Sequence, residues 1–388
     1  MYVGIFSTDY VEKVYRWKTW IKGLFGTFRE NHRFLVTGSA RLDIYRGCGD
    51  SLCVINEIEE PCSPDRSGFP LRSDKQGGMR SLSIFKPKPM QTVKPAPLPL
   101  LGAHFSIAGG LDRALYTARD YGCTALQMFT KNASTWKERV LTRQDIEDFD
   151  RVRQETGIAA IASHTAYLIN LGSPEKTKFE QSCTALKHEL TRALQLGIPM
   201  VVHHPGAHMG AGESLGMDRI AQGINRVLDE SPEFGPLLLL ETCAGQGTTL
   251  GHSFEQLAEI AEKIEQSERI GFCLDTCHIF AAGYDIRTQT TYHETMTGFD
   301  AMLGLDRLHL IHVNDALKDL DSRVDRHTHI GKGKIGINAF AWIMKDERLA
   351  HIPKILETPK KEAGMDWDRK NLDCLLDLII SAGPVSWP

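Results

Sequence analysis

The chain has 388 residues, of which 42% are hydrophobic and 24% are charged, and this composition excludes a protein that is disordered throughout. Its 45 basic and 49 acidic residues give a formal net charge of −4. That balance argues only weakly against a nucleic-acid partner, because a local cationic face or bound metal ions can still attract a polyanion.

The N-terminal stretch, residues 1–53, shows neither an export signal nor a membrane span. Asp9 and Glu12 stand where a signal peptide would place basic and then apolar residues, and the sequence contains no apolar run of about 18 residues. Nine cysteines are scattered without the regular spacing of a disulfide scaffold. We therefore expect a cytoplasmic protein with reduced thiols and no membrane partner.

One part of this stretch, FLVTGSARLDIYRGCGDSL at 34–52, resembles the sensor strand of AAA-type ATPases. No GxxxxGK[ST] phosphate loop precedes it, so the resemblance implies a fragment without the parts needed to hold ATP. The segment KVYRWKTWIKGLF at 13–25 is then an amphipathic remnant. For residues 1–53 we expect a small or poorly ordered extension without enzyme activity.

Residues 54–98 are expected to form a flexible, proline-rich linker. Residues 54–84 are rich in Gly, Pro, Ser and charged residues with little periodicity. Between residues 85 and 101, five prolines stand in a short basic stretch that is typical of an extended connection. The folded domain is therefore predicted to span residues 99–388.

In this domain, short apolar runs alternate with longer amphipathic stretches, which is the pattern of repeated βα units around a parallel sheet. The eight predicted strands are residues 102–106, 125–129, 160–164, 200–204, 237–241, 270–275, 308–313 and 352–357. Between them lie helical patterns such as 254–264, whose spacing gives one apolar face to pack on the sheet. Eight βα units predict an α/β fold, a closed (β/α)8 TIM barrel.

Polar residues at the ends of these strands are the candidates for chemistry. A TIM barrel gathers the C-terminal ends of its strands around one mouth, so residues far apart in the sequence meet there. Two further clusters, DTCH at 275–278 and DRH at 325–327, supply more groups of the kind that bind metal ions. The nine candidate ligands are His164, His204, Glu241, Asp275, His278, His312, Asp325, His327 and Glu357.

Each candidate also has a structural interpretation. Taken alone, an Asp or Glu after a strand often caps the next helix, and a single histidine is more often a hydrogen-bonded packing residue than a ligand. Nine such residues at one end of a barrel are harder to explain, because burying four carboxylates together without cations is very costly. Five imidazoles and four carboxylates without thiolate favour catalytic zinc, with manganese as the alternative.

Strand alternation separates these candidates from nearby histidines and cysteines. His203 precedes His204 directly and His309 lies three residues before His312, so each points away from the candidate on its strand. His104, on the first strand, is expected to fill the barrel interior. Cys273 and Cys277 are interpreted as buried thiols, because a free cysteine packs as a small hydrophobic residue.

Seven segments of the domain carry a more specific pattern. They are SHTAYLINLG, HHPGAH, LETCAGQGTTLG, CLDTCHIFAAGYD, HVNDAL, SRVDRHTHIGKGKIG and ILETPK. In sequence and in order they resemble the signature stretches of the endonuclease IV family, from about residue 100 to beyond residue 360. The resemblance implies a zinc-dependent DNA-repair enzyme and makes the nine candidates the ligands of three zinc ions.

The resemblance also assigns the ligands and the reaction. It gives the first zinc to His164, His204 and Glu241, the second to Glu241, Asp275, His312 and Glu357, and the third to His278, Asp325 and His327. The implied reaction is hydrolysis of the phosphodiester bond 5′ to an abasic site by a hydroxide held on zinc, leaving a 3′-hydroxyl for base excision repair. Removal of blocked 3′ ends from double-stranded DNA is an implied second activity. A nucleoid-associated monomer is the expectation.

Several loop residues are expected to contact DNA. Tyr167 and Leu168 match residues that wedge into the base stack left by an extruded abasic nucleotide. In FTKNASTW at 129–136, Ser134 stands where the family often carries an inserting Arg, so the wedge loses a cation. The expected phosphate contacts are Lys131, Asn132, Lys332 and Lys334. Ordinary loop packing or a solvated loop face is the alternative for these residues.

Two other functions remain open. A sugar isomerase or epimerase on a related barrel also places His, Glu and Asp at strand ends around a divalent metal, but it needs fewer ligands and gives no role to residues 325–327. A DNA-binding or regulatory protein with a dead site is the non-enzymatic alternative. The complete ligand set argues against it.

Overall fold

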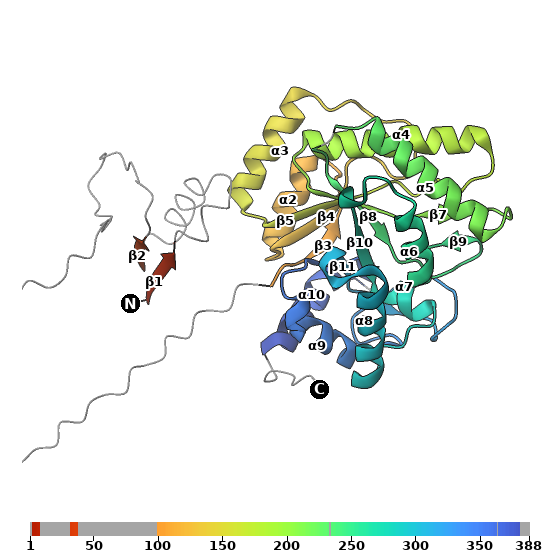
Figure 1. Ribbon diagram of the computed structural model, residues 1–388. Helices are drawn as coiled ribbons and strands as arrows, with labels where there is room; N and C mark the ends of the chain where they lie inside the picture. The colour runs from red at the N-terminus through yellow and green to blue at the C-terminus, as the bar shows by residue number, and fades with distance from the viewer. Residues whose placement is uncertain (1, 8–31, 38–98, 233, 363, 381–388) are drawn as a thin grey trace, which may run out of the picture. The chain divides into compact units, whose positions relative to one another are not determined.

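Figure 1 shows the computed structural model of the chain. It describes residues 2–7, 32–37, 99–232, 234–362 and 364–380. The chain divides into two compact units, Met1–Lys94 and Pro95–Pro388. In the first unit, strand β1 (Tyr2–Ser7) pairs in parallel with strand β2 (His32–Thr37). The amphipathic segment at 13–25, most of the ATPase-like stretch and the linker at 54–98 lie outside the described residues.

The second unit is a closed barrel of eight parallel strands, which confirms the predicted TIM barrel (Figure 1). The strands are β3 (Leu101–Phe105), β4 (Ala125–Phe129), β5 (Ala160–His164), β6 (Met200–His203), β8 (Leu237–Glu241), β10 (Ile270–Asp275), β11 (Leu308–His312) and β14 (Lys354–Leu356). Each strand pairs with the next one in this order, and β14 closes the barrel by pairing with β3.

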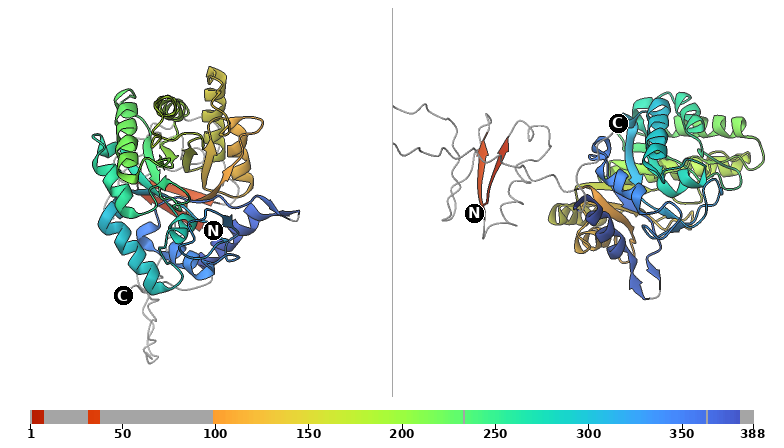
Figure 2. Two further views of the ribbon diagram at one scale, coloured as in Figure 1. Left: turned by 90° about the vertical axis from the view of Figure 1, so that its right-hand side faces the viewer. Right: turned by 90° about the horizontal axis from the view of Figure 1, so that it is seen from below.

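Helices surround the strands on the outside of the barrel (Figure 2). The helices are α2 (Leu111–Asp120), α3 (Arg143–Thr156), α4 (Lys176–Gln195), α5 (Glu213–Asp229), α6 (Phe254–Glu262), α7 (Thr276–Ala281), α8 (Gln289–Leu303), α9 (Ile337–Lys345) and α10 (Trp367–Ile380), with 3₁₀ helices at Ser267–Arg269, Leu305–Arg307 and Glu347–Leu349. The apolar face predicted for α6 is buried, although the helix ends before Ile264. Within the described ranges, no helix is long and apolar enough to cross a membrane.

Three pairs of two-residue strands lie outside the barrel sheet. They are β7 (Gly206–Ala207) with β9 (Thr249–Leu250), β12 (Asp315–Ala316) with β13 (His327–Thr328), and β15 (Lys361–Glu362) with β16 (Met365–Asp366). The pairing of β12 with β13 joins the loop after β11 to the segment that contains His327. This contact brings the DRH cluster, which is remote from any barrel strand in the sequence, to the mouth of the barrel.

Apolar side chains fill the barrel interior below the C-terminal strand ends. They are Ala125, Ala162, Val202, Leu239, Cys273, Leu310 and Ile355, which form one buried cluster. Because side chains alternate along a strand, the residue two positions later on each strand faces the same interior, one layer nearer the strand ends. That layer is where TIM barrels carry their functional sites.

Two strands end one residue before the predicted ligand that follows them. Strand β6 ends at His203, because His204 precedes Pro205, which has no N–H to continue the ladder. Strand β14 ends at Leu356, and the backbone N–H of Glu357 donates instead to the side-chain oxygen of Asn314 at 2.8 Å. Both predicted ligands therefore stand just beyond their strands, with more freedom to turn toward a shared site.

Candidate metal centre

One residue on or directly after each strand lies in the layer above the apolar interior, and six of these eight are predicted ligands. The eight are His104, Gln127, His164, His204, Glu241, Asp275, His312 and Glu357. Glu241, Asp275 and His312 are fully buried, whereas the side chain of Asp325 beside them is 47% exposed. The cluster therefore has a closed, protein-lined floor and opens to solvent at one side.

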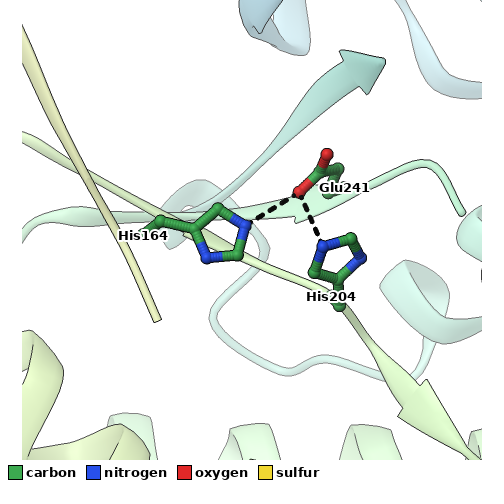
Figure 3. Close-up of side chains that lie close together, drawn as sticks. All are labelled: His164, His204 and Glu241. Carbon is green, nitrogen blue, oxygen red and sulfur yellow. Dashed lines mark hydrogen bonds and ion pairs between the residues drawn. The ribbon is translucent and has the colours of Figure 1, made fainter. Parts of the chain in front are cut away.

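The first ligand group consists of His164, His204 and Glu241, whose ligand atoms face one another (Figure 3). Nε2 of His164 lies 3.1 Å from Oε2 of Glu241, and Nε2 of His204 lies 3.4 Å from the same oxygen. The other nitrogen of His164 donates to the backbone oxygen of Thr165 at 2.8 Å. This bond places a ring proton on Nδ1, so Nε2 is the atom whose lone pair the neutral ring offers to a metal ion.

The second ligand group brings Glu241 together with Asp275, His312 and Glu357. Nδ1 of His312 lies 2.8 Å from Oε1 of Glu241, 3.3 Å from Oε2 of Glu357 and 3.8 Å from Oδ2 of Asp275. Glu241 thus turns one oxygen toward the first group and the other toward the second. A single carboxylate can therefore join two neighbouring metal positions.

The third ligand group consists of His278 on α7, His327 on β13 and Asp325 in the loop before β13. Nε2 of His278 lies 3.2 Å from Oδ2 of Asp325 and 3.4 Å from Nε2 of His327. Nδ1 of each ring bonds a backbone oxygen, that of Thr242 for His278 and that of Glu357 for His327. The two Nε2 atoms consequently converge on one space, an arrangement that a shared cation stabilises.

Electrostatics keep the carboxylates of Glu241 and Asp325 ionised. Burial opposes ionisation of Glu241, but His204 and His312 outweigh it and hold the pKa of that carboxyl well below its usual value. For Asp325, burial is outweighed by the hydrogen bond and charge of His278, and the pKa is about 2. Anionic oxygen donors are therefore present at neutral pH, as metal binding requires.

The two cysteines near the cluster behave as buried thiols. Both are fully buried, and burial raises the pKa of Cys273 to about 12 and that of Cys277 further still. A cysteine binds a metal ion as the thiolate, which these environments disfavour. Cys273 lies close to His312 and Cys277 close to His327. Because deprotonation of these buried thiols is unfavourable, the available metal donors are imidazole nitrogen and carboxylate oxygen.

His203 and His309 lie on the side of their strands that strand alternation predicts. His203 is buried, with Nδ1 3.0 Å from the hydroxyl of Thr165, and His309 is half-buried on the outer side of β11, against Gly271. Burial lowers the pKa of His203 to about 3, so it is neutral. Neither side chain belongs to one of the three ligand groups.

Most of the predicted DNA-contacting residues are exposed on loops at the mouth of the barrel. Tyr167 is 71% exposed and Leu168 37% exposed, and the ring of Tyr167 stands 5.5 Å from that of Phe129. Asn132 and Ser134 are also exposed, and the Asn132 side chain accepts from the backbone N–H of Ser134 at 2.9 Å. Lys332 and Lys334 are likewise exposed, with Lys334 3.3 Å from Asp319.

Lys131 is placed differently from the sequence expectation. Its side chain is only 4% exposed, and Nζ lies 3.8 Å from Glu189 on α4 and 3.7 Å from Glu138. Glu189 in turn accepts from the hydroxyl of Thr130 at 2.9 Å and from the backbone N–H of Ala166 at 3.3 Å. This ammonium is used inside the protein to tie two loops to α4, so it does not support a phosphate contact.

Two residues in the interior layer were not predicted to serve the cluster. Gln127 hydrogen bonds both His312 and Glu357, and Nδ1 of His104 lies 3.2 Å from Glu357. The signal in the sequence was their register: each lies two positions after an interior residue, as the strand-end ligands do. Gln127 thus joins two members of the second ligand group.

Comparisons with known proteins find relatives of the barrel unit. Residues 115–378 match the family model described as "Xylose isomerase-like TIM barrel". "Probable endonuclease 4" of Chloroflexus aggregans is 46% identical over 282 residues, which cover 73% of this chain and 98% of that protein. "Apurinic-apyrimidinic endonuclease" of Caenorhabditis elegans is 45% identical over 264 residues, covering 67% of this chain and 66% of the relative.

A solved structure shows the same relationship in three dimensions. The crystal structure of endonuclease IV from Thermus thermophilus matches with a TM-score of 0.66 and 34% identity, over 73% of this chain and all of that one. The identity, the coverage and the shared barrel are sufficient to place the chain. It belongs to the endonuclease IV family, within the xylose isomerase-like TIM barrels.

Proposed function

We propose that this chain is a zinc-dependent endonuclease of DNA repair that hydrolyses the phosphodiester bond 5′ to an abasic site and leaves a 3′-hydroxyl. The observation that carries the proposal is the position of Glu241, whose two oxygens face different ligand groups. Metal ions joined in this way can stabilise both the attacking and the leaving oxygen of an in-line displacement. The relatives named endonuclease 4 and apurinic-apyrimidinic endonuclease support the same activity.

The ligands fit three zinc ions in kind and in number. Each of the three groups offers at least three nitrogen or carboxylate donors, and catalytic zinc typically takes three protein ligands and keeps a position open. Bound zinc would supply positive charge to the phosphate and lower the pKa of water toward neutrality. Manganese is the alternative for the second group, because three of its four donors are carboxylates.

The chain's own loops would hold the DNA. We propose that Tyr167 and Leu168 fill the space left in the stack when the abasic nucleotide turns outward, which costs little because that nucleotide has no base to unstack. Asn132, Lys332 and Lys334 are proposed to contact backbone phosphates. The proposed substrate is double-stranded DNA with abasic sites or blocked 3′ ends, and the proposed active species is a monomer.

A sugar epimerase is the nearest enzymatic alternative on this type of barrel. Its chemistry needs fewer ligands around a divalent metal, and the second ligand group alone could supply them. The third group, with His278 and His327 converging beside Asp325, would then have no role. The nine-residue cluster therefore favours phosphodiester hydrolysis.

We expect Ser134→Arg to tighten binding of abasic duplex roughly tenfold, near the low end of the stabilisation that one stacking or phosphate contact provides. Ser134 is exposed on the loop after β4, where an added guanidinium can reach bases and phosphates. Cleavage at saturating enzyme should change little, because the metal site and not the loop stabilises the transition state. Binding at matched salt and single-turnover rates measure the two effects separately.

Thr184→Arg is a matched control for that variant. Thr184 is exposed on α4, and the substitution adds the same charge on the outside of the barrel. Thr184→Arg should leave the affinity for abasic duplex nearly unchanged. Equal affinities in wild type and Ser134→Arg would remove Ser134 from the proposed recognition surface.

Deletion of residues 1–97 should leave nicking of abasic duplex within about twofold of the full-length rate, because all nine ligands and the proposed DNA-contacting loops lie in the second unit. Circular dichroism and zinc content establish that the truncated chain is folded and loaded before its rate is compared. A folded, zinc-loaded truncation that fails to nick would contradict the assignment of activity to the barrel alone.

A further inference from the structure

Gln127 is a buried amide at the centre of the proposed metal site. It lies on β4, is fully buried, and occupies the same interior layer as six of the ligands. An amide is a weak ligand for zinc, so Gln127 is not counted among the ligands. Burying its four hydrogen-bonding positions is costly unless they are satisfied, so its partners indicate what it does.

Two of the hydrogen-bond partners of Gln127 belong to the second ligand group. Its Oε1 lies 2.8 Å from Nε2 of His312, and its Nε2 lies 2.6 Å from Oε1 of Glu357. The same Nε2 lies 3.0 Å from Nδ1 of His104. One side chain therefore spans the barrel mouth and touches both a histidine and a carboxylate that face the same metal position.

These contacts determine which way the amide is turned. With the orientation above, the NH2 group donates to the Glu357 carboxylate and the carbonyl accepts from His312. The reversed amide would place its oxygen 2.6 Å from a carboxylate oxygen, and two acceptors at that distance repel. The carbonyl therefore faces His312, and Nε2 of that imidazole must carry a proton.

The position of that proton decides whether His312 can bind a metal ion. A neutral imidazole has one N–H and one lone pair, so a proton on Nε2 leaves the lone pair on Nδ1. Nδ1 is the atom that faces Glu241, Glu357 and Asp275. Without an acceptor at Nε2, the proton could move to Nδ1 and block the ligand atom.

We propose that Gln127 is a positioning residue of the metal site: its amide fixes the tautomer of His312 and the direction of Glu357, an inference that rests on the proposed zinc centre. An amide suits this task because it offers an acceptor and a donor without charge. Glu241, Asp275 and Glu357 already bring three carboxylates to the second group, so a fourth anion at position 127 would add repulsion.

Two variants test this role, with zinc affinity as the main measurement. Gln127→Leu keeps the approximate volume and removes both hydrogen bonds, while Gln127→Glu keeps the acceptor but turns an oxygen toward Glu357. Loss of such an orienting partner typically weakens metal binding about 10- to 100-fold. In a chelator competition titration of the full chain, we expect one of three zinc ions to weaken by that factor in each variant, with the other two unchanged.

Gln256→Leu controls for the loss of a buried amide as such. Gln256 is buried on α6, accepts from the backbone N–H of Gly251 at 2.8 Å and donates to Glu213 at 3.1 Å, without touching a metal ligand. This variant should retain wild-type affinity for all three ions even if its melting temperature falls. Melting curves of every variant show which preparations are folded and can be compared.

The outcomes separate this inference from the proposed function. Wild-type zinc affinities in either folded Gln127 variant would overturn the positioning role while leaving the metal site intact. If the wild-type chain itself bound no zinc, or cut no abasic DNA when loaded, the proposed function would fail first. Selective weakening of one ion, together with a lower single-turnover rate that added zinc restores, is the result that the geometry predicts.

Discussion

Replacing Glu241 with glutamine is expected to lower the single-turnover rate of cleavage at an abasic site by at least about 100-fold. Glu241 is fully buried, with one oxygen facing His164 and His204 and the other facing His312. Glutamine keeps the volume of the side chain but turns an NH2 group either toward His164 and His204 or toward His312. An amide NH2 cannot bind a metal ion. Both neighbouring metal positions are disturbed by one substitution.

The effect is measured on zinc-loaded protein with metal content determined for the same sample. Asp346→Asn is a suitable control, because Asp346 is also a buried carboxylate but caps the 3₁₀ helix that precedes β14, near the opposite end of the barrel. It should lower stability without changing the rate of the folded protein. Full activity of Glu241→Gln with three zinc ions still bound would show that the reaction centre lies elsewhere.

Prolonged chelation should abolish cleavage, and added zinc should restore it. The three ligand groups place five imidazoles and four carboxylates together. Within the described part of the chain, the ion-pair partners of these carboxylates are histidines. Carboxylates buried in this way need positive charge that only protonated histidines or metal ions can supply here. We expect close to three zinc ions per active chain by elemental analysis, or fewer zinc ions with manganese in the second group.

The cleavage activity of protein with fewer bound metal ions distinguishes a three-ion site from a one-ion site. Complete cleavage activity with a single ion per chain would contradict the three-ion site. Activity that survives verified removal of all metal would contradict metal dependence altogether.

The barrel and its ligand layer were predictable because they rest on short-range regularities. Each strand is an apolar run of limited length, and alternation carries an interior residue such as Val202 to the next interior position, His204. The same step leads from Leu239 to Glu241. The last residue of such a run therefore faces the barrel mouth because side chains alternate along a strand, and long-range contacts are not needed to predict this direction.

Features that depend on long-range contacts were predicted less well. Lys131 stands in a polar loop sequence, and only its pairing with Glu189, on a helix 58 residues later, explains its burial. Gln127 stands inside the run ALQMF, where a polar residue gives no sign that it will meet Glu357 from the far end of the chain. Local pattern shows where a side chain points, whereas its partners come from the closed barrel.

The most direct test of the central claim uses a duplex with a single tetrahydrofuran residue, an abasic analogue that cannot undergo β-elimination. Zinc-loaded protein is predicted to cut immediately 5′ to the analogue and to leave a 3′-hydroxyl that a DNA polymerase extends. Cleavage of this substrate requires hydrolysis of the phosphodiester, which is the chemistry that the ligand cluster supports. Binding without cutting, or cutting that leaves an end no polymerase can extend, would contradict the account.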